Sequence, residues 1–314
     1  MERKWFLNPT ALITLIFLAI FVSYLRIRSD DPDFAFGAPS PYGAKFLDAL
    51  TLSGGVISPA LSAEAALSVF VDGEGRTKVL FERNASKKMP IASIAKLMTA
   101  LVVSEYLSQD KEIIISRAAI DEPEEAGQFR PGEVFLAGDL LYSLLVESSN
   151  DAAAALAETI GREKFVSLMN AEAENIGLGD TYFANPTGLD ESDFAGPTGY
   201  STASDLFKLA RFLTENRRRI LEISSLPAYD LYDARGRLHH TLESTNELLR
   251  RRSWPVKVLG GKTGETPLAK QALILVTESP INRGYLVSVA LGSGDRFGDI
   301  KALVTWVFNS YSWY

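Results

Sequence analysis

Residues 89–99 read Met-Pro-Ile-Ala-Ser-Ile-Ala-Lys-Leu-Met-Thr, which places a serine and a lysine three positions apart at the predicted start of a helix. The proline precedes that helix, and apolar residues follow at helical spacing. Because positions i and i+3 share a helix face, the Ser93 hydroxyl and the Lys96 amine can meet without help from the rest of the fold. A neutral lysine beside a hydroxyl can activate it as a nucleophile. The spacing alone is more typical of a polar helix face, so the remaining sequence has to decide.

Length, charge and composition exclude several kinds of function. The chain has 314 residues, enough for one large or two ordinary domains, and its formal net charge is −7. This acidic balance argues against a nucleic-acid partner. There is no cysteine, and the two histidines, His239 and His240, are adjacent. We therefore expect no disulfide, no metal site and no cofactor, and a Ser-His-Asp triad would have to use one of these two histidines.

An uncharged, mostly apolar run occupies residues 5–25, with two basic residues close to each end. About 20 such residues span a bilayer core. A cleaved signal peptide is the alternative, but residues 25–28 lack the small side chains of a cleavage site. We predict a short tail at 1–4, an uncleaved transmembrane anchor at 5–25, and a linker at 26–64 that prolines and glycines keep irregular.

Residues 65–314 are predicted to form one domain, in which two strands are followed by several helices, then by further strands and a last helix. Alternating apolar residues indicate an early hairpin, and three closely spaced strands come late in the chain, before a closing helix; the strand ranges are 66–71, 79–81, 256–264, 272–276 and 285–291. Short connections favour antiparallel pairing. The pattern predicts a mixed α/β fold, with helices packed on a sheet.

Two further motifs accompany the Ser93–Lys96 pair. Residues 148–150, Ser-Ser-Asn, lie in a break between two predicted helices, the second of which Asp151 is expected to cap. Residues 262–264, Lys-Thr-Gly, lie on a predicted strand. Alone, the first is typical of a capped helix junction and the second of an edge strand with a protective lysine. In this order, the three motifs form the set found in penicillin-binding proteins and class A β-lactamases.

On these motifs, residues 66–296 resemble the D-alanyl-D-alanine carboxypeptidases, the low-molecular-mass penicillin-binding proteins among the serine peptidases. Residues 185–190 (Asn-Pro-Thr-Gly-Leu-Asp), 200–203 (Tyr-Ser-Thr-Ala) and 261–267 are also similar to that family. The resemblance implies a β-lactamase/transpeptidase-like fold, with a five-stranded antiparallel sheet flanked by helices, an all-helical lobe, and the site between them. Ser149 stands where the family usually has glycine. Only 50 residues follow Gly264, so we expect no C-terminal β-domain.

The resemblance and the chemistry of the side chains assign four catalytic roles. Ser93 is the expected nucleophile, and Lys96 the general base once burial and the charge of Lys262 lower its pKa. Ser148 is expected to bridge the Lys96 and Lys262 amines and to relay a proton to the leaving amine. Asn150 is expected to hold the Lys96 amine and the substrate amide.

Five further residues are expected to form the substrate-binding site: Lys262, Thr263, Gly264, Glu265 and Arg296. Lys262 and the Thr263 hydroxyl would bind a terminal carboxylate. The backbone N–H groups of Ser93 and Glu265, the latter directly after Gly264, would form the oxyanion hole. Arg296 is a second cation for the carboxylate, although it is also typical of a surface arginine at a helix start.

We therefore expect a serine-type carboxypeptidase that removes the terminal D-alanine from peptidoglycan stem pentapeptides and is inhibited covalently by β-lactams. Residues 5–25 would anchor it in a bacterial cell membrane, with the catalytic domain on the outer side. A D,D-endopeptidase acting on cross-links is the alternative. A β-lactamase is disfavoured because no glutamate-bearing loop like that of class A enzymes is recognisable, and a catalytically weak scaffold is disfavoured because all the motif residues are present.

Overall fold

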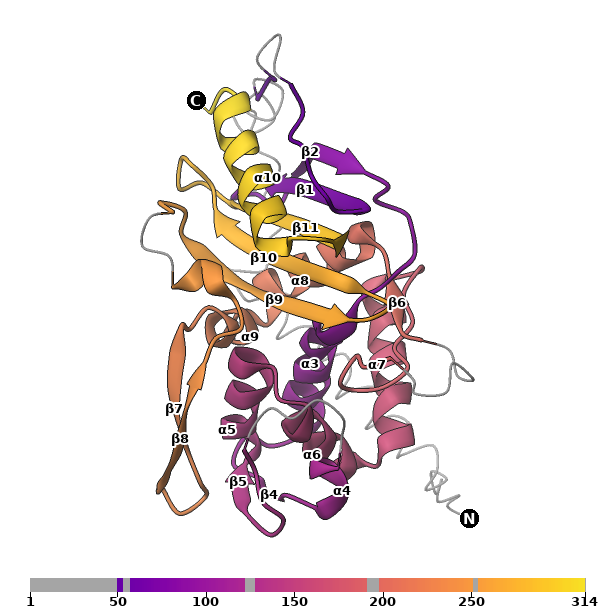
Figure 1. Cartoon of the computed structure of the whole chain (residues 1–314), viewed down its shortest axis with the longest axis vertical. Coiled ribbons are helices and arrows are strands. Elements are labelled where there is room, and N and C mark those ends of the chain that lie inside the picture. The colour runs from indigo at the N-terminus through magenta and orange to yellow at the C-terminus, as the bar shows by residue number, and fades with distance from the viewer. Residues whose placement is uncertain (1–49, 53–56, 122–127, 191–197, 251–253, 314) are drawn as a thin grey trace, which may run out of the picture. The chain divides into compact units, whose positions relative to one another are not determined.

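The computed structural model describes residues 50–52, 57–121, 128–190, 198–250 and 254–313 (Figure 1). The chain divides into two units, Met1–Asp48 and Ala49–Tyr314, and the described residues all belong to the second. The predicted tail and anchor, and the linker up to residue 49, lie outside these residues. Within the described ranges, every helix is too short or too polar to cross a bilayer.

A five-stranded antiparallel sheet forms the centre of this unit, in the order β2-β1-β11-β10-β9. Its strands are β1 (Ala65–Val71), β2 (Thr77–Arg83), β9 (Val258–Thr266), β10 (Lys270–Glu278) and β11 (Tyr285–Ser293). Two short turns connect β9, β10 and β11, whereas β1 pairs with β11 across most of the chain, with Leu67 opposite Val289. The predicted five-stranded antiparallel sheet is confirmed, and β9 is one of its two edges.

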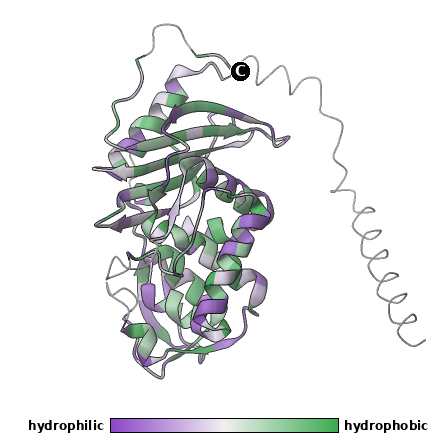
Figure 2. Cartoon of the chain, turned by 90° about the vertical axis from the view of Figure 1, so that its right-hand side faces the viewer, coloured by the Kyte–Doolittle hydropathy of each residue, from purple (hydrophilic) through white to green (hydrophobic). Residues whose placement is uncertain are grey.

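Helices cover both faces of the sheet (Figure 1). Helix α10 (Arg296–Ser310) packs Ile300 and Val304 against Leu273 and Leu275 of β10. The alternate β10 residues, such as Ile274, belong to the larger core on the other face, with α8 (Ala203–Asn216) and the helical lobe. Figure 2 shows the resulting hydrophobic colouring in strands and in the helix faces turned toward them. Burial on both faces explains why these strands read as continuous apolar runs.

The helical lobe surrounds helix α3, whose residues from Lys96 to Val103 are all buried. A helix that is buried all round needs no polar face. The lobe's other helical segments are η2 (Ala92–Ala95), α4 (Arg117–Ile120), α5 (Ala137–Tyr142), η3 (Ser143–Glu147), α6 (Asn150–Ile160), α7 (Arg162–Ile176) and α9 (Arg218–Ser224). The short turn η4 (Glu247–Leu249) instead packs Leu248 into the core beside α10.

The expectation of an all-helical lobe is wrong, because three short antiparallel ladders accompany the helices. They pair β3 (Met89–Pro90) with β6 (Tyr200–Ser201), β4 (Glu112–Ile114) with β5 (Val134–Leu136), and β7 (Ala228–Tyr232) with β8 (Leu238–Glu243). The first two are too short to show an alternating pattern. The third is mostly exposed, so only Leu231 and Leu242 of its residues are buried and no apolar face is visible in the sequence.

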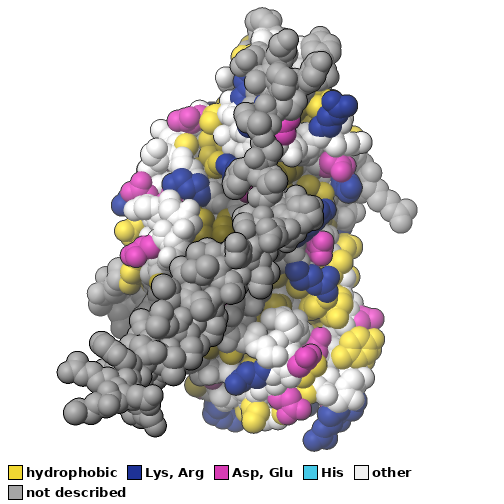
Figure 3. Space-filling model, turned by 180° about the vertical axis from the view of Figure 1, so that it is seen from behind, with side chains coloured by type: hydrophobic (Ala, Val, Ile, Leu, Met, Phe, Trp, Pro, Cys, Tyr) yellow, Lys and Arg dark blue, Asp and Glu magenta, His cyan; other side chains and the backbone are white. Residues whose placement is uncertain are grey.

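The surface mixes both signs of charge, as the face in Figure 3 shows. Many of these groups form ion pairs. Lys270 and Lys87, for example, both bind Glu64, and their hydrogen bonds and charges lower the pKa of Glu64 to about 2.

Candidate active site

The Ser93 motif forms a turn and a helix start rather than one continuous helix. Strand β3 ends at Pro90, Ser93 lies in the 3₁₀ turn η2, and Lys96 opens α3. Ala92 has a φ of 48°, which is unfavourable for a residue with a side chain and is found mostly where the surroundings impose it. Ser93 is half-buried, whereas the Lys96 side chain is completely buried.

Lys96 Nζ is surrounded by oxygen atoms from three parts of the chain. It lies 2.7 Å from Ser93 Oγ, 2.7 Å from Asn150 Oδ1 and 3.0 Å from the carbonyl oxygen of Thr187. A neutral amine can donate to the last two and turn its lone pair toward the Ser93 hydroxyl. This geometry is the one that proton transfer from serine to lysine requires. The structure therefore brings Ser93, Lys96 and Asn150 together.

The turn at residues 185–190 contacts Lys96 through the Thr187 carbonyl oxygen. The Asn185 side chain accepts hydrogen bonds from the Gly188 and Thr187 backbone, and Thr99 of α3 donates to the Pro186 carbonyl oxygen at 2.6 Å. A Cβ on Gly188 would lie 2.0 Å from the Ala92 oxygen, so only glycine permits this approach. The sequence shows this motif, but the contact of its Thr187 carbonyl with Lys96 was not predicted.

Ser148 follows η3 in the left-handed conformation, with a φ of 69°. Its hydroxyl lies 2.8 Å from Lys262 Nζ, and its predicted contact with Lys96 stays a prediction. The next residue, Ser149, caps α6 by accepting a hydrogen bond from the Ala152 N–H. The expectation that Asp151 caps this helix is wrong, because Asp151 lies inside its first turn. A serine at the family's usual glycine position thus has a structural use.

The two histidines lie on strand β8, and one of them contacts the residue before Ser148. His240 contacts Glu147, the residue before Ser148, and His239 contacts Glu133, each at 3.2 Å. Their Nδ1 atoms lie 2.6 Å apart. We interpret the pair as a structural bridge between the β7–β8 hairpin and the helical lobe. A serine–lysine mechanism does not require a histidine.

Strand β9 brings a second buried lysine to the site. Lys262 is 1 % exposed, and burial, then the charges of Lys96 and Arg296, hold its pKa well below the usual range of lysine. Its amine also donates to the Thr263 carbonyl oxygen at 3.0 Å. The Thr263 hydroxyl lies 2.6 Å from that of Thr245, which the loop after β8 supplies. Thr245 was not predicted, since nothing in its polar surroundings distinguishes it from an ordinary loop threonine.

Gly264 lets β9 approach the Ser93 turn. A Cβ at this position would lie 2.7 Å from the Ile91 oxygen and 3.3 Å from the Ser93 nitrogen. The next residue, Glu265, therefore follows a strand segment in close contact with the nucleophile turn, as an oxyanion hole made of the Ser93 and Glu265 N–H groups requires. Arg296, at the start of α10, donates from Nη1 to the Gly264 carbonyl oxygen at 3.0 Å and to Glu265 Oε2 at 2.8 Å.

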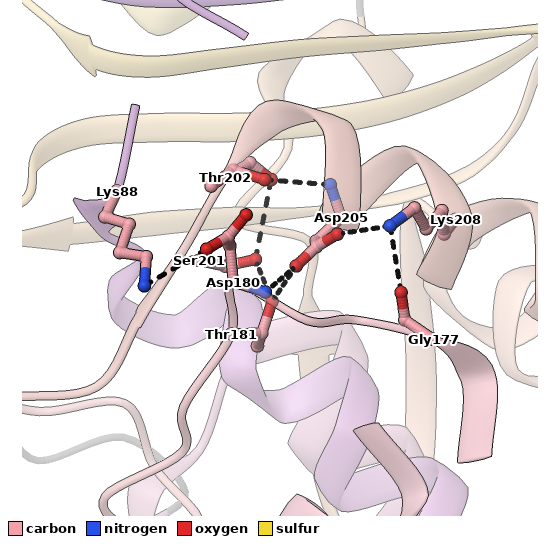
Figure 4. Close-up of polar contacts among 8 residues, drawn as sticks. All are labelled: Lys88, Gly177, Asp180, Thr181, Ser201, Thr202, Asp205 and Lys208. Atoms are coloured by element: carbon pink, nitrogen blue, oxygen red, sulfur yellow. Dashed lines mark hydrogen bonds and ion pairs between the residues drawn. The ribbon is translucent and has the colours of Figure 1, made fainter. Parts of the chain in front are cut away.

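A buried polar network holds the strand that leads into Ser93 (Figure 4). The Asp205 carboxylate, at the start of α8, accepts hydrogen bonds from Asp180 N and Thr181 Oγ1. It also forms an ion pair with Lys208. Thr181 in turn contacts Ser201, whose backbone pairs with Met89 in the β3–β6 ladder. The motif at residues 200–203 thus positions the approach to the nucleophile.

The described residues contain no group of three or more histidine, cysteine, aspartate or glutamate side chains placed to hold a metal ion. What they do contain is a serine hydroxyl against a buried lysine, a second serine against a second buried lysine, and a glycine strand edge beside the nucleophile. This combination defines a serine hydrolase site in which lysine replaces histidine as the base.

Comparison with known proteins identifies the group to which this site belongs. Residues 55–294 match the D-alanyl-D-alanine carboxypeptidase family of serine peptidases, S11, and the chain belongs to that family. A D-alanyl-D-alanine endopeptidase of Pseudomonas aeruginosa is 32% identical over 254 residues, which cover 77% of each chain.

Solved structures of this group have the same fold. A D-alanyl-D-alanine carboxypeptidase from Mycobacterium tuberculosis is similar with a TM-score of 0.71 and 27% identity, over 82% of this chain and 95% of that one. Penicillin-binding protein D2 from Listeria monocytogenes, in its ampicillin-bound form, is similar with a TM-score of 0.66 and 32% identity, over 81% of this chain and 100% of that one.

Proposed function

We propose that this protein is a serine-type D-Ala-D-Ala carboxypeptidase that removes the terminal D-alanine of peptidoglycan stem pentapeptides through an acyl-enzyme on Ser93. The observation that carries the proposal is the 2.7 Å contact between the Ser93 hydroxyl and the completely buried Lys96 amine. Membership of the family agrees with this activity.

Acylation follows from the positions of these groups. Lys96 takes the hydroxyl proton while Ser93 Oγ attacks the carbonyl carbon of the penultimate D-alanine. The resulting oxyanion is stabilised by the Ser93 and Glu265 N–H groups, and losing one such donor typically costs about 3–4 kcal/mol. The C–N bond then breaks, and the amine of the departing D-alanine receives a proton through Ser148, whose hydroxyl contacts Lys262.

Deacylation reverses the roles. Water attacks the ester carbonyl carbon, Lys96 takes its proton, and the Ser93 oxygen leaves and is protonated again. During acylation, before the terminal D-alanine leaves, its carboxylate is bound by the Thr263 hydroxyl and by the Lys262 and Arg296 side chains. The relay to the leaving amine runs from the Lys96 ammonium through the Ser148 hydroxyl.

A D,D-endopeptidase is the second candidate, because the Pseudomonas aeruginosa relative carries that name. The same acyl-enzyme serves both reactions, since both cleave a peptide bond after a D-alanine. We further propose that residues 5–25 anchor the enzyme in the bacterial membrane and hold the catalytic domain on its outer side; their uncharged, apolar composition supports this.

Labelling with a fluorescent penicillin tests the nucleophile. The native enzyme is expected to form a stable covalent adduct and Ser93→Ala to form none. Ser104→Ala is the control and is expected to label normally, because Ser104 lies on helix α3 and its hydroxyl donates to the Ala100 carbonyl oxygen of the same helix. An adduct on Ser93→Ala would contradict the assignment. Incubation with pentapeptide and with cross-linked muropeptides then separates the two candidates, and penicillin binding without cleavage of either would favour a scaffold.

A further inference from the structure

The Glu265 carboxylate forms an ion pair with Arg296, one of the cations to which the proposed mechanism binds the substrate carboxylate. Glu265 Oε2 lies 2.8 Å from Arg296 Nη1, and the two groups form an ion pair. Glu265 was singled out in the sequence only for its backbone N–H. Its side chain plays no part in the chemistry proposed above.

The two partners of this ion pair differ in how firmly they are held. The Arg296 side chain is 14 % exposed, whereas that of Glu265 is 58 % exposed. The Arg296 backbone N–H donates to the Gln271 side chain of β10, and Gln271 lies opposite Glu265 in the β9–β10 register. The arginine is therefore fixed beside the strand, whereas the glutamate is the partner that can swing away.

A substrate oxygen can reach only part of the Arg296 guanidinium group. Its Nε atom is buried and has no hydrogen-bond partner in the described part of the chain, so a substrate oxygen cannot reach that edge of the guanidinium. The Nη1 atom, which faces the Gly264 carbonyl and Glu265, lies next to the Thr263 strand segment where the substrate carboxylate is expected.

We propose that Glu265 is a specificity-determining residue, which fills the carboxylate subsite of the free enzyme and must be displaced by the carboxylate of the residue that leaves. Two carboxylates on one guanidinium repel each other. An acyl donor with a free carboxylate thus pays for the displacement, and one with a carboxamide there does not. Glu265 therefore lowers kcat/KM for substrates whose leaving residue ends in a carboxylate, relative to kcat/KM for substrates whose leaving residue ends in a carboxamide. This inference rests on the proposed function.

The test compares two peptides that end in D-Ala-D-Ala and differ only in a C-terminal carboxylate or carboxamide. Glu265→Gln keeps the backbone N–H and removes the charge. We expect it to raise kcat/KM for the acid about two- to fivefold, the range for an exposed ion pair, and to leave the amide unchanged. Glu243→Gln, which breaks another exposed ion pair, with Arg250, is the matched control and should change neither.

An equal change for both peptides, or none for either, would overturn the inference. In an Arg296→Gln background the Glu265→Gln effect should disappear, and its persistence would also count against the competition. Binding of the two peptides to Ser93→Ala, measured by calorimetry with and without Glu265→Gln, gives the same comparison without turnover. The inference about Glu265 can thus fail while penicillin still labels Ser93. Its failure is therefore distinguishable from failure of the proposed function.

Discussion

At the scale of single residues, two lysines buried beside each other dominate the site. Lys96 and Lys262 are 0 % and 1 % exposed, and burial and the neighbouring charges lower the pKa of Lys262. Electrostatic repulsion is mutual, so a charged Lys262 also disfavours protonation of Lys96. The Ser-x-x-Lys spacing indicated the pair. The depressed pKa of Lys262 depends on burial and on a lysine 166 positions earlier in the chain, which spacing cannot show.

This mutual repulsion predicts a shift in the pH profile. The base must be neutral, so acylation by penicillin should rise with pH as the acid limb is passed. In Lys262→Gln the neighbouring charge is gone, Lys96 keeps its proton to higher pH, and the limb should move upward. The measurement is the second-order acylation rate from pH 5 to 10, with the exposed Lys257→Gln as control. An unmoved or lowered limb would refute the coupling.

At the scale of elements, the site depends on β9 approaching the turn before α3. The sequence predicted β9, β10 and β11 and the helix after Pro90, because their apolar patterns are long enough to recognise. It did not predict that Ser93 lies in a 3₁₀ turn with Ala92 in the left-handed region. That backbone is imposed by Gly188 and Gly264, both of which approach the turn from distant parts of the chain.

Gly264→Ala tests this approach. The added Cβ would lie 2.7 Å from the Ile91 backbone oxygen, so either the strand or the turn has to shift. We expect acylation to fall about a hundredfold, because small displacements of the oxyanion donors are costly, and the free energy of unfolding to fall by about 1–3 kcal/mol. Gly73→Ala, where nothing lies within 4 Å, is the control for both measurements. Native acylation kinetics in Gly264→Ala would show that the approach is not needed.

At the scale of the whole unit, Leu50, which precedes β1, is attached to the sheet edge opposite the site. Leu50 is fully buried, its carbonyl oxygen accepts a hydrogen bond from Lys78 of β2, and Leu52 bridges to Tyr311 after α10. Strands β2 and β9 are the two edges of the sheet. Part of the predicted linker therefore contributes to stability at a distance from Ser93.

Leu50→Ala should consequently separate stability from activity. We expect the free energy of unfolding to fall by about 2–4 kcal/mol, as for other buried leucines, while penicillin acylation at 25 °C stays unchanged. Denaturant unfolding and labelling measure the two quantities. Leu52→Ala, at an exposed position, should alter neither. A slower acylation in Leu50→Ala would mean that this edge influences the site.

The sequence by itself determined the mixed α/β class, the strand segments and the three motifs, because local periodicity and short motifs are properties of neighbouring residues; the five-stranded sheet was implied by the family resemblance that these motifs carry. Only the tertiary structure decided which atoms meet: the Thr187 carbonyl on Lys96, the Thr245 hydroxyl on Thr263, and the Glu265 carboxylate on Arg296. These contacts join segments that are 18 to 91 positions apart. They depend on how the helical lobe and the sheet edge pack together, and so does the burial that makes a serine and a lysine in one helical turn into a nucleophile and its base.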